Sequence, residues 1–218
     1  MAQAILTISS KNYSSWCLRS WLMAKWAGLD FEEKIVSSDD PSVRAELLLQ
    51  SSSILVPTLT HGGVTIWDTL AIGEYLNERF AKAGLLPSDP GARAHCRSIC
   101  GEMHSGFAAL RSALPVNLKS SKPDFVVWSA AQADIDRILK IWQECFARWK
   151  GPYLFGKKLT IADAMYAPVC TRFRTYCVKL APEADDYCER IMTLPTMVEW
   201  IEAAKLEPED MPELDAEF

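Results

Sequence analysis

The apolar pattern of this chain changes across residues 83–93, and that change constrains the fold more than any other feature. Before it, short apolar runs rich in β-branched residues alternate with segments of helical spacing. Ala4–Ile8 is the first such run, and apolar residues then recur at helical spacing up to Gly28. After residue 93 the strand patterns stop. The alternation predicts a sheet covered by helices, and its loss predicts an all-helical second part.

The first part contains enough elements for a small mixed sheet. Its further predicted elements are a strand at Phe31–Val36, a short helix with Val43, Leu47 and Leu48 that begins at Asp40-Pro41, a hairpin of Val56–Thr60 and Val64–Trp67 around His61-Gly62-Gly63, and a helix at Thr69–Phe80. The order strand-helix-strand-helix-strand-strand-helix combines one parallel crossover with an antiparallel hairpin. An α/β domain with a mixed sheet is therefore expected.

The stretch AGLLPSDPGAR (83–93) interrupts this order and is typical of a linker, because it is rich in Gly and Pro. The segments of helical spacing beyond it run from Cys96 to Leu114, from Trp128 to Trp149, from Thr160 to Phe173, and over residues 183–192 and 196–204. We therefore expect a first domain at residues 1–82, a linker at 83–93 and an all-α domain at 94–218.

The composition excludes several classes of partner. The net charge is −5 and no basic run stands out, so neither nucleic acid nor an anionic membrane is expected as a partner. The N-terminus lacks the basic and apolar regions of a signal peptide, and no apolar stretch approaches the length of a membrane span. Seven cysteines without paired spacing fit reduced thiols. These features together predict a cytoplasmic protein.

Two hydroxyls and a thiol lie where the first strand passes into the first helix, in Ser14-Ser15-Trp16-Cys17. A helix N-terminus stabilises an anion, so Ser14 or Ser15 is positioned to donate its hydroxyl to a thiolate and lower the pKa of that thiol. The alternative is an ordinary N-cap serine, which is the commoner case. Ser14-x-x-Cys17 also has redox Cys-x-x-Cys spacing, but serine in the attacking position excludes dithiol exchange. Cys17 is expected to be a small buried residue.

Two further sites have the chemistry to hold parts of a peptide ligand. A cis Val56–Pro57 bond would present the N–H and C=O of Val56 to an extended ligand, although sequence alone favours the commoner trans bond. Asp68 and Thr69 lie at a predicted helix start, where the carboxylate suits the amine of an amino-acid head and the hydroxyl suits its carboxylate. An ordinary helix cap is again the alternative.

These three sites, followed by a Gly/Pro linker and an all-α half, resemble the cytosolic glutathione S-transferases over essentially the whole chain. LVPTL (55–59) resembles the cis-proline strand of that family, WDTLAIGEYL (67–76) its Glu-Ser-x-Ala-Ile-x-x-Tyr-Leu motif, and LTIADAMYAP (159–168) the capping box of its second domain. EMHSGFAALRSALP (102–115) resembles a bacterial subgroup whose N-terminal motif is also Asn-Tyr-Ser-Ser-Trp. The resemblance implies a thioredoxin-like N-terminal domain, an all-α C-terminal domain and a bacterial serine-type member.

The resemblance also implies an activity and a set of site residues. It implies a homodimeric detoxification enzyme that uses glutathione as co-substrate, needs no metal, and attacks a small hydrophobic electrophile with a thiolate activated by Ser14, or by Ser15 as the alternative. The implied glutathione-binding residues are Ser14, Ser15, Leu55, Val56, Pro57, Asp68 and Thr69, and the implied electrophile-site residues are Tyr13, His104, Ala108 and Arg111. Two alternatives stay open: a maleylacetoacetate isomerase-like enzyme, and a non-catalytic binding or regulatory protein on the same fold.

Some residues depart from the family pattern or invite a different assignment. Ile54 and Leu55 stand where the family often has Gly-Lys or Gly-Arg, so the contact with the glycine carboxylate of glutathione is missing or comes from elsewhere. His104, Ala108 and Arg111 are expected on one helical face, where Arg111 either holds an anionic substrate group or is merely solvated. Cys96, Cys100 and His104 are spaced four apart, but both cysteines continue an apolar stripe, which favours core packing over a metal site. The acidic residues from Glu207 to Glu217 are expected to form a solvated tail.

Overall fold

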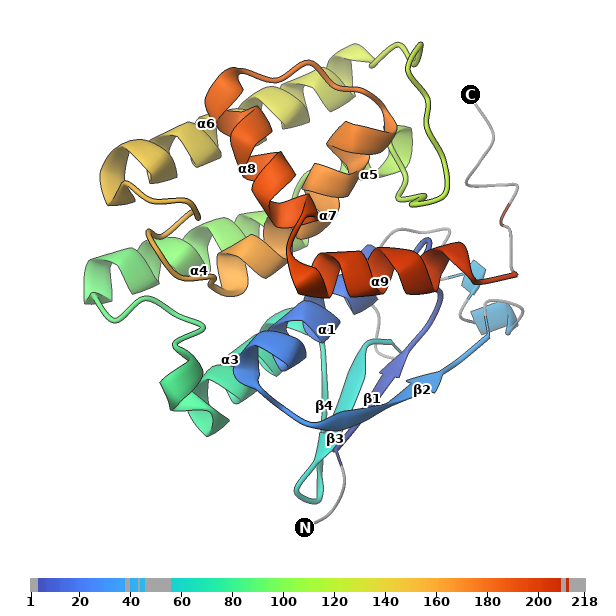
Figure 1. Ribbon diagram of the computed structural model, residues 1–218, viewed down its shortest axis with the longest axis vertical. Coiled ribbons are helices and arrows are strands. Elements are labelled where there is room, and N and C mark those ends of the chain that lie inside the picture. The colour runs from blue at the N-terminus through green and yellow to red at the C-terminus, as the bar shows by residue number, and fades with distance from the viewer. Residues whose placement is uncertain (1–3, 38–39, 43, 46–55, 209–210, 212–218) are drawn as a thin grey trace.

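The computed structural model describes residues 4–37, 40–42, 44–45, 56–208 and 211. The elements, in chain order, are β1 (Ala4–Ile8), α1 (Ser15–Ala27), β2 (Phe31–Ile35), β3 (Thr58–His61), β4 (Val64–Trp67), α3 (Thr69–Arg79), a 3-10 turn at Ala81–Ala83, α4 (Pro90–Ser105), α5 (Ala108–Ala113), α6 (Ser129–Trp149), α7 (Ile161–Thr175), α8 (Pro182–Met192) and α9 (Pro195–Lys205). Figure 1 shows the sheet at one end of the molecule, with α1 and α3 between it and the helices of the second half.

The sheet is mixed, as the apolar pattern predicts. Its strand order is β2-β1-β3-β4, in which β1 pairs in parallel with β2 and antiparallel with β3, and β3 pairs antiparallel with β4. Residues of β1 alternate between buried and half-buried positions, and its buried residues belong to the same core cluster as those of α1. Helix α1 ends at Gly28, whose φ of 74° is the left-handed conformation that glycine adopts without strain. The thioredoxin-like first domain that the resemblance implies is confirmed.

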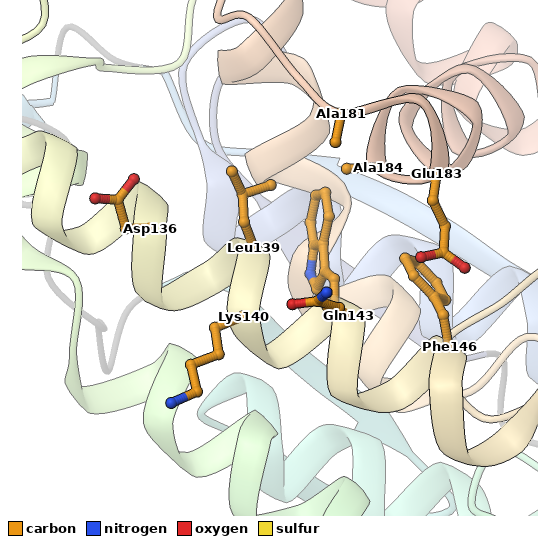
Figure 2. Close-up of a pocket in the computed structure, with 9 residues that line it drawn as sticks. Asp136, Leu139, Lys140, Gln143, Phe146, Ala181, Glu183 and Ala184 are labelled. Atoms are coloured by element: carbon orange, nitrogen blue, oxygen red, sulfur yellow. The ribbon is translucent and has the colours of Figure 1, made fainter.

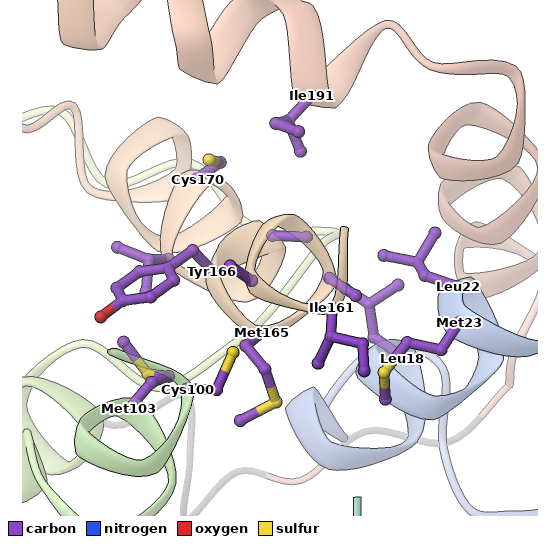
Figure 3. Close-up of a cluster of buried hydrophobic side chains, with 14 of the residues drawn as sticks. Leu18, Leu22, Met23, Cys100, Met103, Ile161, Met165, Tyr166, Cys170 and Ile191 are labelled. Atoms are coloured by element: carbon purple, nitrogen blue, oxygen red, sulfur yellow. The ribbon is translucent and has the colours of Figure 1, made fainter. Parts of the chain in front are cut away.

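The second half is all-helical, and its core is continuous with that of the first. Figure 3 shows Leu18, Leu22 and Met23 of α1 facing Ile161 and Met165 of α7, and all of them belong to one cluster of buried side chains. Helix α7 is buried along nearly its whole length and contacts α1, α4 and α8. The all-α second domain is therefore confirmed, and it packs on the first domain through apolar side chains.

One predicted helix is broken in the structure. The apolar spacing from Cys96 to Leu114 predicts a single helix, whereas α4 ends at Ser105 and α5 begins at Ala108. Between them Phe107 has a φ of 58°, which lies outside the helical region. A contact with a distant residue holds the break, since the Leu110 N–H donates to Asp134 Oδ2 at 2.9 Å. The local apolar spacing carries no signal for this contact.

The domain limits at residues 82, 83–93 and 94 stay a prediction. Helix α4 begins at Pro90, inside the predicted linker, because Asp89 caps it by accepting the Ala92 N–H at 2.7 Å. The predicted short helix with Leu47 and Leu48 lies mainly outside the described residues, although Asp40 does accept the Ser42 N–H at 2.9 Å. Within the described part of the chain, no helix has both the length and the apolar character that a membrane crossing requires.

Candidate active site

Ser14 is the N-cap of α1 and lies at the end of a tight loop from β1. Its N–H donates to the Ser10 carbonyl at 3.0 Å, and its Oγ accepts the Cys17 N–H at 3.3 Å. The side chain is 4% exposed. A hydroxyl oxygen that accepts one hydrogen bond still carries a hydrogen to donate, and the described residues offer no acceptor for it. The N-cap that the local pattern predicts is therefore confirmed.

Ser15 faces the second domain. Its Oγ accepts from Arg19 Nη1 at 3.1 Å, and Arg19 Nε donates to the Met165 carbonyl of α7 at 2.8 Å. Arg19 is fully buried, and burial, with the positive charges of Arg172 and Arg111, lowers its pKa well below the usual value. The Ser15 hydroxyl is thus part of the contact between the domains, whereas the Ser14 hydroxyl lies at the N-terminus of α1.

Cys17 is a core residue, as its place in an apolar helix predicts. It is 0% exposed, and its Sγ accepts the Ser9 N–H at 3.4 Å. The thiol therefore points toward the loop that follows β1.

The Val56–Pro57 bond is cis. The prediction of a trans bond is therefore wrong. It rested on the low overall frequency of cis bonds before proline, which says nothing about one particular strand. The resemblance to a cis-proline strand is confirmed. Val56 is 4% exposed and Pro57 directly precedes β3. Leu55, the remaining predicted glutathione-binding residue of this strand, lies outside the described residues.

Asp68 caps α3 and also reaches the second domain. Its Oδ1 accepts the N–H groups of Leu70 at 2.8 Å and Ala71 at 3.3 Å, and its Oδ2 lies 2.5 Å from His104 Nε2. Partial burial raises the pKa of this carboxyl, but the hydrogen bond and charge of His104 and the two backbone N–H groups outweigh it, so the pKa lies below the usual value. Thr69, the first residue of α3, is 2% exposed.

The four residues of the expected electrophile site lie in different surroundings. His104 meets Asp68 and packs against Trp16, with ring centroids 5.2 Å apart. The Tyr13 hydroxyl accepts the Met211 N–H at 3.0 Å, and its ring is buried. Because α4 and α5 are separate helices, the expectation that His104, Ala108 and Arg111 share one helical face is wrong.

Arg111 has two features relevant to its role. Its Nη1 donates to the carbonyls of Met103 and Gly106, so it caps the C-terminal end of α4. Its guanidinium carbon lies 5.8 Å from the Trp16 ring centroid, beside the residues of the α1 N-terminus. Burial lowers its pKa, with a smaller opposing effect from Asp134. Arg111 is 9% exposed, so the solvated arginine considered from sequence is wrong, and binding of an anionic group stays a prediction.

Two residues that hold the loop before Ser14 were missed by the sequence reasoning. Glu207 accepts from Ser10 Oγ at 2.7 Å and from the backbone N–H groups of Lys11 at 2.6 Å and Asn12 at 3.1 Å. Asn12 Oδ1 accepts the Leu118 N–H at 2.7 Å. The expectation that Glu207 belongs to a solvated tail is therefore wrong, and no spacing rule connects residues this far apart in the chain.

Other candidate sites lie apart from these residues. Cys96 and Cys100 are in the core, as their place on the apolar stripe predicts, and the described residues contain no group of three side chains suited to a metal ion. A hollow of about 440 Å³ lies between α6 and α8, and Figure 2 shows the side chains around it. Its lining residues are Asp136, Leu139, Lys140, Trp142, Gln143, Phe146, Ala181, Glu183 and Ala184, none of which belongs to the predicted site.

Comparison with known proteins identifies the family. Models of the N-terminal and C-terminal domains of glutathione S-transferase match residues 13–79 and 125–203. Glutathione S-transferase 1 of Dianthus caryophyllus is 30% identical over 158 residues, which cover 71% of this chain and 70% of that relative. The chain belongs to the glutathione S-transferase family.

Other relatives within the family differ in their named activity. A probable maleylacetoacetate isomerase of Caenorhabditis elegans is 29% identical over 168 residues, which cover 77% of this chain and 78% of that protein. The structure of a glutathione transferase homolog from Burkholderia GL BGR1 with bound glutathione superposes with a TM-score of 0.70 at 24% identity, over 93% of this chain and 98% of the other. A maleylacetoacetate isomerase from Anaeromyxobacter dehalogenans 2CP-1, also with bound glutathione, superposes with a TM-score of 0.64 at 22% identity, over 95% of this chain and 97% of the other. At these identities the structures establish a shared fold.

Proposed function

We propose that this protein is a serine-type glutathione transferase in which the Ser14 hydroxyl stabilises the thiolate of bound glutathione. The observation that carries the proposal is the hydrogen bonding of the two serines. Each hydroxyl accepts one hydrogen bond and keeps its own hydrogen, but Ser14 Oγ lies at the helix start beside the Cys17 N–H, whereas Ser15 Oγ is held by Arg19, which donates to the Met165 carbonyl of the second domain. Ser14 also lies at the N-terminus of α1, where the helix dipole favours an anion.

The proposed reaction needs no covalent intermediate on the protein. The glutathione thiol releases its proton to solvent, and the Ser14 O–H donates to the resulting thiolate, which lowers the thiol pKa. The thiolate then forms a carbon–sulfur bond with a small hydrophobic electrophile, and the electron pair of the broken bond leaves with the displaced group. Positioning and a lowered thiol pKa account for the rate.

The rest of glutathione is proposed to extend over the first domain. Leu55, Val56 and Pro57 would line the peptide, with Val56 pairing to its cysteinyl part. Asp68 would receive the glutamyl amine, and the Thr69 hydroxyl with the N-terminus of α3 would receive the glutamyl carboxylate. We further propose that the protein acts as a homodimer in the cytoplasm, as the family resemblance implies.

Replacement of Ser14 tests the proposal. Ser14→Ala is expected to lower kcat/KM for a standard electrophile by about 10- to 100-fold and to raise the pKa of bound glutathione thiol, since a hydrogen bond to a charged group contributes about 1.5–3 kcal/mol. Ser15→Ala is the matched control and is expected to change stability more than the thiol pKa. Thiol ionisation is measured by the thiolate absorbance of bound glutathione across pH. An unchanged thiol pKa and rate in Ser14→Ala would refute the assignment.

A second candidate is a glutathione-dependent isomerase, which the relatives named maleylacetoacetate isomerase favour. In this reaction the thiolate adds to a double bond of a cis-dienoic diketo acid, the resulting single bond rotates, and the thiolate leaves to regenerate glutathione. Arg111 near Trp16 would hold a substrate carboxylate. Product analysis separates the two reactions, because isomerisation consumes no glutathione whereas conjugation consumes one glutathione per product.

A further inference from the structure

The contact between Asp68 and His104 joins the proposed glutathione site to the second domain. Asp68 precedes α3 of the first domain, and His104 lies in the last turn of α4 of the second. Their side chains meet at 2.5 Å between Oδ2 and Nε2, and they are 31% and 22% exposed. Both side chains keep part of their surface exposed, so the contact is not part of the closed core.

The His104 ring is held on two sides. Its Nε2 meets Asp68, and its ring lies against Trp16 with an angle of 58° between the ring planes. Trp16 itself is 6% exposed and packs face-on against the Arg19 guanidinium at 4.4 Å. Since Trp16 comes two residues after Ser14, the imidazole connects the two ends of the proposed glutathione site.

The Asp68 carboxylate has a limited number of places for a ligand. An ionised carboxylate offers about four acceptor positions. Leu70 N–H and Ala71 N–H occupy Oδ1, and His104 takes one position on Oδ2. One position on Oδ2 is left, and the described residues supply no donor for it. The Asp68 backbone has a φ of 72°, an unusual conformation for a residue with a side chain. The direction of the last acceptor position follows the orientation of the carboxylate, which the contacts with Leu70, Ala71 and His104 hold.

We propose that His104 is a positioning residue of the glutathione site, which holds the Asp68 carboxylate so that its remaining acceptor position meets the glutamyl amine. The inference rests on the proposed function, since it concerns how the same site recognises glutathione. With this role for His104, recognition of the amine depends on both domains, because the group that orients the Asp68 carboxylate comes from α4.

A purely structural role would predict a different pattern. Glu74 of α3 and Arg97 of α4 form a second ion pair between the same two helices, with distances of 2.7 and 2.8 Å. If His104 only tied α3 to α4, then breaking this second pair would affect glutathione in the same way. Glu74→Gln is therefore a matched control that loosens the same helix contact without touching Asp68.

The test compares glutathione with N-glutaryl-cysteinylglycine, the analogue that lacks the amine. Calorimetry is expected to show wild-type protein binding glutathione about tenfold more tightly than the analogue, from a hydrogen-bonded ion pair at the amine. His104→Ala is expected to reduce this preference to about twofold or less by weakening glutathione alone. His104→Gln restores part of the preference through its amide N–H, and Glu74→Gln keeps it. In an Asp68→Asn background, His104→Ala is expected to have no further effect on the preference.

Three results would overturn the proposal. One is a folded His104→Ala protein, verified by its free energy of unfolding, that keeps the full preference for glutathione. Another is an equal loss of preference in Glu74→Gln. If wild-type protein fails to bind glutathione at all, the proposed function fails together with the role of His104, whereas the first two results leave the proposed function intact.

Discussion

At the scale of single residues, the two adjacent serines have separate tasks because they occupy adjacent positions of a helix start. The N-cap side chain points back to the first turn, whereas the next residue already follows the helix and turns toward its own i+4 neighbour. Ser14 accordingly meets the Cys17 N–H, and Ser15 meets Arg19. A difference of one residue along the helix start therefore separates the partners of the two serines.

Replacing Ser14 by cysteine is expected to produce a monothiol activity. The introduced thiol at the helix N-terminus would attack a glutathionyl mixed disulfide and release the other thiol, and free glutathione would then resolve the new disulfide to oxidised glutathione. Cys17 takes no part, because its Sγ is buried against Ser9. Reductase activity is expected in Ser14→Cys and equally in the double variant Ser14→Cys/Cys17→Ala. Dependence of the activity on Cys17, or an internal disulfide found by mass spectrometry, would contradict this.

The lowered pKa of Asp68 predicts the direction of an acid effect. The pKa of its carboxyl is lower in the folded protein than in the unfolded chain, so the ionised form stabilises the fold above about pH 4, the usual range of an aspartate. This contribution is lost as the pH falls through the folded pKa. The stability difference between wild-type protein and Asp68→Asn, measured by urea unfolding, is expected to be present at pH 7 and to shrink toward pH 3. A difference that grows on acidification would contradict the assignment.

At the scale of elements, the turn before α7 shows a local motif extended by distant contacts. Asp163 accepts from the Thr160 N–H at 2.8 Å and from Thr160 Oγ1 at 2.9 Å, which completes the capping box that the sequence predicts. The same carboxylate also accepts the Leu154 N–H and the Tyr187 hydroxyl, both at 3.0 Å. It therefore joins α7 to the preceding loop and to α8.

Asp163→Ala is expected to lower the free energy of unfolding by about 3–5 kcal/mol, since it leaves several buried donors without an acceptor. Burial raises the Asp163 pKa despite these hydrogen bonds, so Asp163→Asn, which is uncharged and keeps an acceptor oxygen, is expected to lose less. Urea unfolding of both variants provides the measurement. A loss in Asp163→Ala no larger than that of an exposed substitution would show that the carboxylate is not needed.

The elements also show where sequence reasoning succeeds and where it stops. Strand β1, helix α1 and the capping box of α7 have local signals, namely apolar period, cap residues and a glycine stop, and all were predictable. The break between α4 and α5 was not, because Asp134, which lies beyond the segment, accepts the Leu110 N–H and holds the break. The same reason explains the site: Ser14 and Asp68 were proposed from their local motifs, but the partnership of Asp68 with His104 depends on how two domains pack.

At the scale of the whole molecule, the C-terminal part of the chain secures the loop that precedes Ser14. Glu207, just after α9, accepts three hydrogen bonds from Ser10, Lys11 and Asn12. Trp200 of α9 donates its indole N–H to the Lys11 carbonyl at 2.9 Å. Two segments at opposite ends of the sequence therefore determine the position of the proposed catalytic hydroxyl together.

Glu207→Ala is expected to lower kcat/KM with glutathione about tenfold, because the loop loses the acceptor for three donors and Ser14 is no longer held in place. Glu202→Ala is a matched control on α9, since among the described residues Glu202 pairs with the exposed Lys205 alone, at 2.8 Å. It is expected to retain wild-type kinetics, measured at varied glutathione concentration. Equal kinetics in both variants would rule out a role for Glu207 in the site.

The contact of Glu207 with the early loop also bears on how the protein is made. The loop is translated well before the carboxylate that holds it, which is added 195 residues after Asn12. N-terminal domains generally fold first while the ribosome is still adding residues. The first domain of this chain can therefore form its sheet and α1 on the ribosome, but the loop before Ser14 reaches its final position only after residue 207 has been translated. Competence for catalysis is thus expected to arise late in synthesis, after the first domain has folded.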